Sequence, residues 1–161
     1  MVGIGYDIHR LARGHRLKLG GIEIPSDRGA VAHSDGDVVL HALCDALLGA
    51  AALGDIGEWF PDTDPQWKGA DSATFVEAII AALQARHLSV AHIDSTIVLQ
   101  QPKIAPYKQA MRRRIAELCQ VPLSAVSIKA TTNEQLDSLG NGEAVAAWVV
   151  CLLKPASAGN E

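Results

Sequence analysis

The chain of 161 residues contains little cysteine, and its cysteines are not arranged for disulfide bonds. Cys44, Cys119 and Cys151 are odd in number, widely spaced and set in apolar stretches, with no CxxC pair among them. This usage is typical of reduced core residues. We therefore expect a cytoplasmic protein without a disulfide framework.

Long apolar runs and a basic excess are also absent from the sequence. Its most apolar stretch, residues 38–53, is shorter than the ~20 residues that cross a bilayer, and His41 and Asp45 interrupt it. The first residues lack the basic segment and apolar core of an export signal. The formal net charge is −4, and residues 112–114 form the only tight basic run. We expect no membrane span and no nucleic-acid partner.

The order of hydrophobic patterns predicts one α+β domain. No repeat or linker divides the chain, and its length suits a single core. We predict a domain over residues 1–154 and a flexible C-terminal tail over 155–161. Helical periodicity and period-2 alternation predict helices at about 37–53, 72–86 and 106–118, and strands at 2–9, 92–99, 126–131 and 145–153 with a hairpin at 17–24. The expected fold is a mixed β-sheet with helices layered on one face.

A DxH pattern and a polar stripe on a buried helix predict a metal site. Asp7 and His9 alternate on one strand, so they point to the same side. Asp37, His41 and Asp45 recur at i, i+4 and i+8 on an otherwise apolar helix. Two imidazole nitrogens and one carboxylate oxygen suit zinc and leave a fourth position open, as in catalytic sites. We predict Asp7, His9 and His41 as ligands, with Asp37 or Asp45 orienting His41.

Taken alone, a DxH pattern more often reflects ordinary core or surface histidines, but a second polar cluster lies nearby. Residues 33–37 (HSDGD) place His33 and Ser34 just before a helix N-terminus, where free N–H groups favour an anion. We predict a phosphate there. The alternative is that Ser34, Asp35 and Asp37 only cap the helix.

Two further clusters combine acidic and hydroxyl groups. Residues 55–64 hold four acidic side chains between helices and suit sugar hydroxyls or cations, or else form a solvated turn. Residues 129–134 (KATTNE) end a strand with two hydroxyls and a carboxylate. The hydroxyls suit phosphate, and Glu134 suits a second hard cation such as Mg²⁺. An ordinary strand end is the alternative.

Together these motifs closely resemble those of the 2-C-methyl-D-erythritol 2,4-cyclodiphosphate synthases, over residues 2–153. The resemblance is carried by residues 5–9 (GYDIH), 33–37 with His41, 54–57 (GDIG), 60–64 (FPDTD), 94–96 (DST), 101–103 (QPK) and 129–134. It implies a phosphorus-oxygen lyase of non-mevalonate isoprenoid biosynthesis. Such an enzyme cyclises 4-diphosphocytidyl-2-C-methyl-D-erythritol 2-phosphate and releases CMP. The substrate's own phosphate is the nucleophile, so positioning and charge neutralisation carry the catalysis.

The resemblance also implies residue roles and an assembly. Asp7, His9 and His41 would bind one Zn²⁺ per subunit, and Glu134 would help to hold a Mg²⁺ or Mn²⁺ at the diphosphate. His33 and Thr132 would stabilise the transition state. The implied substrate-binding residues are Ser34, Phe60, Pro61, Asp62, Thr63 and Asp64 for the methylerythritol, Asp55, Ile56 and Gly57 for the ribose, Leu99, Gln100, Gln101, Pro102, Lys103, Ile104 and Ala105 for the cytidine, and Thr131, Asn133, Ser138 and Asn141. The expected assembly is a homotrimer with sites between subunits.

Two other functions are compatible with the same residues. A zinc phosphohydrolase would use the open metal position to activate water, with Asp37 or Asp45 as the general base. A noncatalytic trimeric binding module would keep the pocket without the chemistry. The intact set of implied catalytic and metal residues argues against the binding module.

One segment departs from the family pattern. Where relatives commonly carry an aromatic residue and an arginine, this chain has Ser138 and Asn141. In the family these positions line a cavity on the trimer axis that can hold an isoprenoid diphosphate. We expect weak or no binding of such a ligand here, because an apolar contact and a charge-assisted phosphate contact are both missing.

Overall fold

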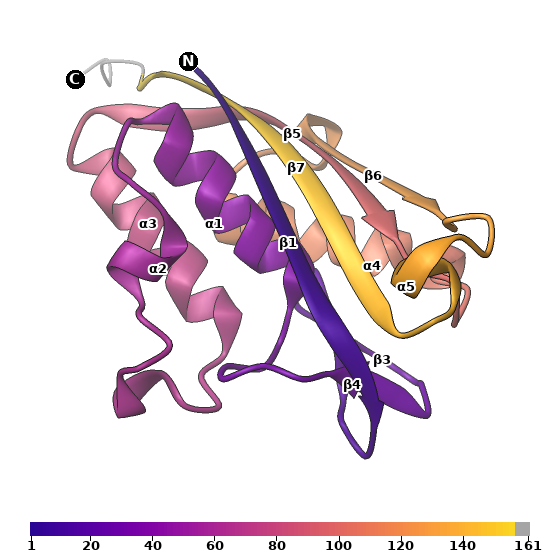
Figure 1. Ribbon diagram of the computed structural model, residues 1–161. Helices are drawn as coiled ribbons and strands as arrows, with labels where there is room; N and C mark the ends of the chain where they lie inside the picture. The colour runs from indigo at the N-terminus through magenta and orange to yellow at the C-terminus, as the bar shows by residue number, and fades with distance from the viewer. Residues whose placement is uncertain (157–161) are drawn as a thin grey trace.

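The computed structural model describes residues 1–156 and contains a five-stranded mixed sheet (Figure 1). The strand order is β4-β1-β7-β5-β6. Strands β5 and β6 are parallel, whereas the other neighbours are antiparallel. The strand bounds are β1 Val2–Arg13, β4 Arg28–Ala30, β5 Leu88–Val98, β6 Val126–Thr131 and β7 Ala144–Pro155, and a separate hairpin pairs β2 Leu17–Leu19 with β3 Ile22–Ile24.

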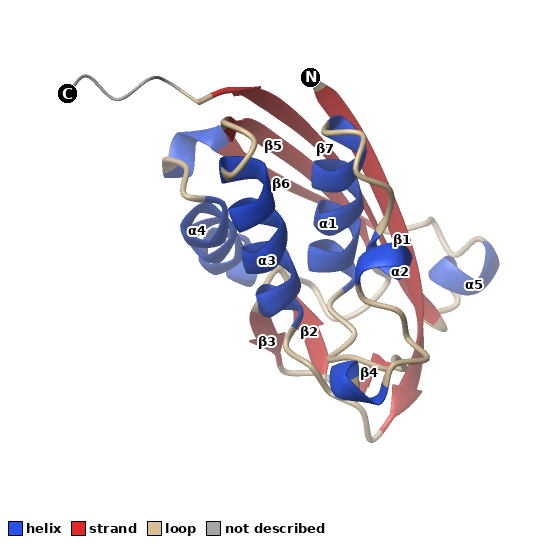
Figure 2. Cartoon of the chain, turned by 90° about the vertical axis from the view of Figure 1, so that its left-hand side faces the viewer, coloured by secondary structure: helices blue, strands red, loops and turns tan. Residues whose placement is uncertain are grey.

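Three helices cover one face of this sheet (Figure 2). They are α1 Val38–Ala50, α3 Ser72–Gln84 and α4 Lys108–Cys119. The first packs on β1 and β7, and nearly all of its side chains are buried. Two short helices, α2 Ile56–Trp59 and α5 Asp137–Gly140, and 3₁₀ turns at Pro65–Trp67, Ala105–Tyr107 and Leu123–Ala125 lie in the connections.

The close approach of α1 to β1 depends on two glycines. A Cβ atom at Gly3 would overlap the carbonyl oxygen of Ala46, and one at Gly5 would overlap that of Ala42. Because side chains alternate along a strand, Asp7 and His9 continue the same face of β1. The glycines therefore allow the helix to lie where these two polar side chains can reach it.

The opposite face of β1 and β7 is apolar and exposed. Tyr6 pairs with Trp148 and Ile4 with Val150, and their exposed fractions range from 39% to 67%. Val2 and Leu152 extend the same surface. A contiguous patch of this kind is typical of an interaction surface rather than of a free monomer face.

The structure confirms the predicted α+β fold with a mixed sheet and helices on one face. It also confirms the hairpin, and all three cysteines are free and buried. Strand β4 and helix α2 were not predicted. Strand β5 begins four residues before the predicted start, because a bulge between Val90 and His92 interrupts its alternation.

Only the first two residues of the predicted C-terminal tail, 155–161, are among the described residues. Pro155 lies in β7, and residues 157–161 are outside the described residues. Within residues 1–156, no helix has the length and apolar character needed to cross a membrane.

Gly5→Ala is expected to lower the free energy of unfolding by about 1–3 kcal/mol or more, because the added methyl group forces α1 away from β1. Gly49→Ala is the matched control. Gly49 lies in α1 with open space around its Cα, so the same change should stabilise the helix by roughly 0.5–1 kcal/mol. Denaturant unfolding at one protein concentration measures both. Equal changes in the free energy of unfolding of the two variants would contradict the role of Gly5.

Candidate functional site

Asp7, His9 and His41 place three potential metal ligands together. Asp7 Oδ2 lies 3.0 Å from His9 Nε2 and 3.0 Å from His41 Nδ1, and the two nitrogens are also 3.0 Å apart. The first two residues come from β1, and His41 comes from the first turns of α1. These side chains are partly buried, and the three atoms form the compact triangle of a metal centre.

The geometry of this triangle fits a small divalent ion. Tetrahedral zinc with bonds of about 2.0–2.1 Å separates its ligand atoms by about 3.3 Å, close to the distances observed. Two imidazoles and one carboxylate are a suitable donor set, and three protein ligands leave one position open. Burial acts to raise the pKa of Asp7, but hydrogen bonds with His41 and His9 outweigh it and lower this pKa to about 2. The carboxylate is therefore ionised.

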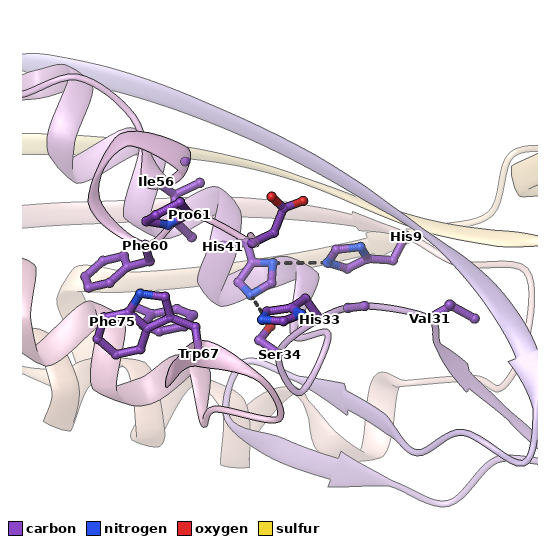
Figure 3. Close-up of a pocket in the computed structure, with 13 residues that line it drawn as sticks. His9, Val31, His33, Ser34, His41, Ile56, Phe60, Pro61, Trp67 and Phe75 are labelled. Atoms are coloured by element: carbon purple, nitrogen blue, oxygen red, sulfur yellow. Dashed lines mark hydrogen bonds between the residues drawn. The ribbon is translucent and has the colours of Figure 1, made fainter. Parts of the chain in front are cut away.

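A cavity of about 500 Å³ adjoins the triad (Figure 3). His9 and His41 form part of its wall, as do His33 and Ser34 from the loop before α1. Other predicted residues complete one side of the cavity: Ile56, Gly57, Phe60, Pro61 and Asp62. The triad thus borders a space that can hold a small molecule.

Two of the N–H groups that the predicted anion site would use, at the N-terminus of α1, already have an acceptor. Asp37 is the N-cap, and its Oδ1 accepts hydrogen bonds from the backbone N–H groups of Val39 and Leu40. The same carboxylate also accepts from Gly20 N and Gly21 N in the β2–β3 turn. A phosphate cannot use N–H groups that already have an acceptor. The capping alternative is therefore correct for Asp37.

Neither Asp37 nor Asp45 orients His41, so this prediction was wrong. Asp37 is fully buried, and its carboxylate accepts hydrogen bonds from the four backbone N–H groups described above. Burial raises the pKa of Asp37. Asp45 accepts from Ile56 N, which ties α2 to α1. The partner of His41 is instead Ser72 at the start of α3, with its Oγ 2.8 Å from Nε2. The sequence offered no signal for Ser72 beyond a helix start.

The acidic residues of the 55–64 segment have local structural contacts. Asp55 caps α2 through Glu58 N, and Asp64 accepts from Gln66 N. His33 Nε2 lies 3.1 Å from the carbonyl oxygen of Asp64, so the two predicted segments meet at the cavity. Trp67 and Phe75, which were not predicted, also line it.

The remaining predicted residues do not line this cavity within the described part of the chain. The side chains of Leu99 and Ile104 are in the hydrophobic core, which leaves only their backbone for a ligand. Thr132 and Glu134 are exposed at the end of β6 and contact each other, with Oγ1 and Oε1 3.4 Å apart. Of the 55–64 segment, Asp55, Thr63 and Asp64 do not line the cavity themselves. The other predicted residues that do not line it are Leu99, Gln100, Gln101, Pro102, Lys103, Ile104, Ala105, Thr131, Thr132, Asn133, Glu134, Ser138 and Asn141.

Comparison with known proteins gives consistent relatives. Residues 1–154 match the model of the YgbB family. A 2-C-methyl-D-erythritol 2,4-cyclodiphosphate synthase from Pseudomonas putida (strain W619) is 54% identical over 155 residues, which cover 96% of this chain and 99% of that protein. A synthase of the same name from Trichlorobacter lovleyi is 48% identical over 154 residues, covering 96% and 98%.

Solved structures agree with these relatives. A 2C-methyl-D-erythritol-2,4-cyclodiphosphate synthase in its CDP-bound form matches with a TM-score of 0.88 and 40% identity, over 96% of this chain and 100% of that one. The bifunctional IspDF of Campylobacter jejuni matches with a TM-score of 0.92 and 38% identity. The match covers 96% of this chain but 42% of the longer bifunctional chain.

His41→Ala is expected to abolish metal retention while leaving the fold largely intact, because the variant keeps only two of the three ligands. The test is metal analysis after loading with zinc chloride and desalting, with circular dichroism to verify the fold. His92→Ala is the control, since His92 is exposed on β5 and distant in sequence from the triad. Full zinc occupancy in His41→Ala would remove His41 from the ligand set.

Proposed function

Because the chain belongs to the YgbB family, we propose that it cyclises 4-diphosphocytidyl-2-C-methyl-D-erythritol 2-phosphate to 2-C-methyl-D-erythritol 2,4-cyclodiphosphate and releases CMP. The observation that carries this proposal is the Asp7–His9–His41 triad at the edge of a cavity. The reaction belongs to non-mevalonate isoprenoid biosynthesis, and we place it in the cytoplasm.

The triad residues would hold a zinc ion in this reaction. A bound zinc ion supplies positive charge that polarises a phosphate oxygen and is worth several kcal/mol of transition-state stabilisation. Glu134 would hold a Mg²⁺ or Mn²⁺ together with the diphosphate. Its single exposed carboxylate fits this role, because Mg²⁺ is commonly bound by one or two carboxylates, waters and substrate phosphates.

The protein contributes orientation and charge rather than a nucleophile. An oxygen of the substrate's 2-phosphate forms a bond to the β-phosphorus, and the bond from that phosphorus to the bridging oxygen breaks. CMP leaves with the electron pair. His33 and Thr132 would donate hydrogen bonds to the phosphoryl oxygens as charge redistributes. Intramolecular positioning of this kind can lower a barrier by roughly 7–11 kcal/mol.

The cavity walls support assignment of the two ends of the substrate. Ser34 and residues 60–62 line the cavity and would hold the methylerythritol beside the triad, together with the adjoining Thr63 and Asp64. Gly57, also in the wall, and the nearby Asp55 would hold the ribose. The apolar side chains of Ile56 and Phe60 keep water from the reacting phosphates, which favours cyclisation over hydrolysis. Residues 99–105 would hold the cytidine, since structural relatives are CDP complexes.

A homotrimer would bring the two sets of residues together. In one chain, residues 99–105 and 131–134 do not reach the cavity, so a site made from both sets requires a neighbouring copy. The exposed apolar face of β1 and β7 supplies a surface for that contact. We therefore propose three copies packed by these sheet faces, with each site between adjacent subunits.

Incubation with the substrate and both metal ions should give the cyclic diphosphate and CMP, read by phosphorus NMR. A linear monophosphate would indicate the phosphohydrolase, and an unchanged substrate the binding module. Asp37 is a poor general base for hydrolysis, because it is buried and accepts four backbone hydrogen bonds.

Thr132→Ala should lose turnover with nearly unchanged substrate affinity, as expected of a group acting in the transition state.

Thr74→Ala serves as the control for Thr132→Ala. Thr74 lies in α3 and its hydroxyl binds the carbonyl oxygen of Asp71, so turnover should be unaffected. A rise in the dissociation constant of Thr132→Ala that matches its loss of kcat/KM would contradict the assigned role.

Geranyl or farnesyl diphosphate should bind weakly or not at all. Ser138 and Asn141 are exposed and supply neither an aromatic surface nor a positive charge, and each missing charge-assisted contact is worth roughly 1.5–3 kcal/mol. Calorimetric titration measures the binding, and light scattering on the same sample verifies the trimer. The double variant Ser138→Phe with Asn141→Arg should restore affinity. Micromolar binding of one ligand per trimer by the unaltered protein would refute this proposal.

A further inference from the structure

We propose that Ser72 is a positioning residue for the metal site. Held by Asp35 and Lys18, its hydroxyl accepts a hydrogen bond from His41 Nε2 and fixes the orientation of the ring. Nδ1 of His41 then faces Asp7 and His9 and is the nitrogen that would bind the ion. This inference rests on the metal site of the proposed function and concerns residues that have no part in the substrate contacts.

The contact between Ser72 and His41 is short and buried. Ser72 Oγ lies 2.8 Å from His41 Nε2, and Ser72 has no exposed surface. On the other side of the ring, Nδ1 lies 3.0 Å from both Asp7 Oδ2 and His9 Nε2. The two nitrogens of His41 therefore have separate functions: one faces the metal ligands, and the other faces the start of α3.

The direction of the hydrogen bond between Ser72 and His41 follows from counting donors. The Ser72 hydroxyl has one hydrogen, and it is directed to Asp35 Oδ1 in a short hydrogen bond. A carboxylate can only accept, so Ser72 Oγ offers a lone pair to His41. His41 Nε2 must then be the donor. Nδ1 lies on the other side of the ring and faces Asp7 and His9, so it is the nitrogen that would bind the ion.

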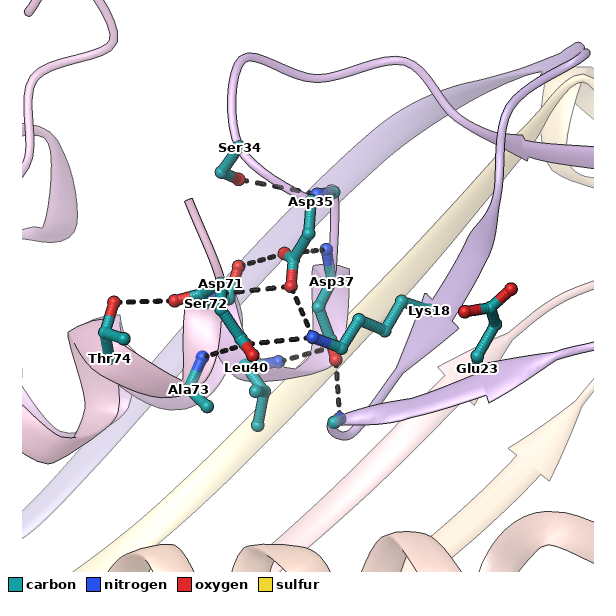
Figure 4. Close-up of polar contacts among 12 residues, drawn as sticks. Lys18, Glu23, Ser34, Asp35, Asp37, Leu40, Asp71, Ser72, Ala73 and Thr74 are labelled. Carbon is teal, nitrogen blue, oxygen red and sulfur yellow. Dashed lines mark hydrogen bonds and ion pairs between the residues drawn. The ribbon is translucent and has the colours of Figure 1, made fainter. Parts of the chain in front are cut away.

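Lys18 keeps Asp35 in the accepting state (Figure 4). Its ammonium lies 2.8 Å from Asp35 Oδ2 and 2.9 Å from Asp71 Oδ1. Burial acts to lower the pKa of Lys18, but the hydrogen bonds with Asp35 and Asp71 outweigh it and raise this pKa. Asp35 also accepts from the backbone N–H groups of Ser72 and Asp37. With these donors on the carboxylate, Asp35 Oδ1 is the acceptor for the Ser72 hydroxyl.

Ser34 cannot substitute for Ser72 in this role. Its Oγ is also near His41 Nε2, but at the longer distance of 3.1 Å. It accepts a weak contact from Gly36 N at 3.4 Å, and within residues 1–156 no acceptor fixes the direction of its own proton. The Ser34 hydroxyl can therefore donate or accept, whereas the Ser72 hydroxyl can only accept from His41.

The Ser72 contact matters because the partner of the second ring nitrogen selects which nitrogen binds metal. Without Ser72, the ring loses the contact that holds Nδ1 toward Asp7 and His9. Removing such an outer contact typically lowers metal affinity about 10- to 100-fold.

The first test is the proton on His41 Nε2 in zinc-free wild-type protein, read from the ¹⁵N chemical shifts of the ring by long-range proton–nitrogen NMR. We expect Nε2 to be protonated. An Nε2 without a proton would overturn the proposal. This measurement needs no variant and no metal, so it stands even if the proposed zinc site or the cyclase activity fails.

The second test is zinc affinity by competition with a chromophoric chelator. Ser72→Ala should bind zinc about 10- to 100-fold more weakly and lose the proton held on His41 Nε2, whereas Ser34→Ala should keep that proton. An unchanged zinc affinity in folded Ser72→Ala would overturn the proposal. If Ser72→Ala does not fold, Lys18→Met replaces it, with weaker zinc binding expected and unchanged affinity again contradicting the role. No zinc binding by wild-type protein would instead refute the proposed metal site.

Discussion

The metal centre depends on the close packing of α1 against β1. Gly3 and Gly5 leave no side chain between the strand and the helix backbone, so α1 lies against this face of the sheet. Two residues further along the same face, side chains resume as Asp7 and His9. His41 extends from the adjacent end of α1 to meet them. The two glycines thus set the distance between β1 and α1. At this distance, the side chains of Asp7 and His9 reach His41.

The polar residues around this contact mainly hold the elements in place. Asp37 joins the N-terminus of α1 to the β2–β3 turn, and Lys18 on that hairpin joins Asp35 to the start of α3. Every charged group in this region therefore has a partner, which lowers the penalty of burying it. Such an arrangement keeps the ligands in position before an ion or a substrate arrives.

The chain carries its predicted functional residues in two separated groups. One surrounds the cavity beside the triad, and the other lies at the ends of β5 and β6. The exposed apolar face of β1 and β7 offers the surface on which copies of the chain could pack. In the proposed trimer, each site forms only when the subunits associate. Dilution would therefore weaken both stability and activity.

The sequence by itself determined the elements and the ligand set, because both depend on local spacing. Period-2 alternation predicted β1 with Asp7 and His9 on one side, and the i, i+4 stripe predicted His41 on a buried helix. Tertiary structure decided how the other polar groups are used. Asp37 could cap a helix or leave it open to an anion, and only the nearby Gly20–Gly21 turn shows that its oxygens are already occupied. Ser72 lies 31 residues from His41, and no periodicity links positions that meet only when α3 packs beside α1.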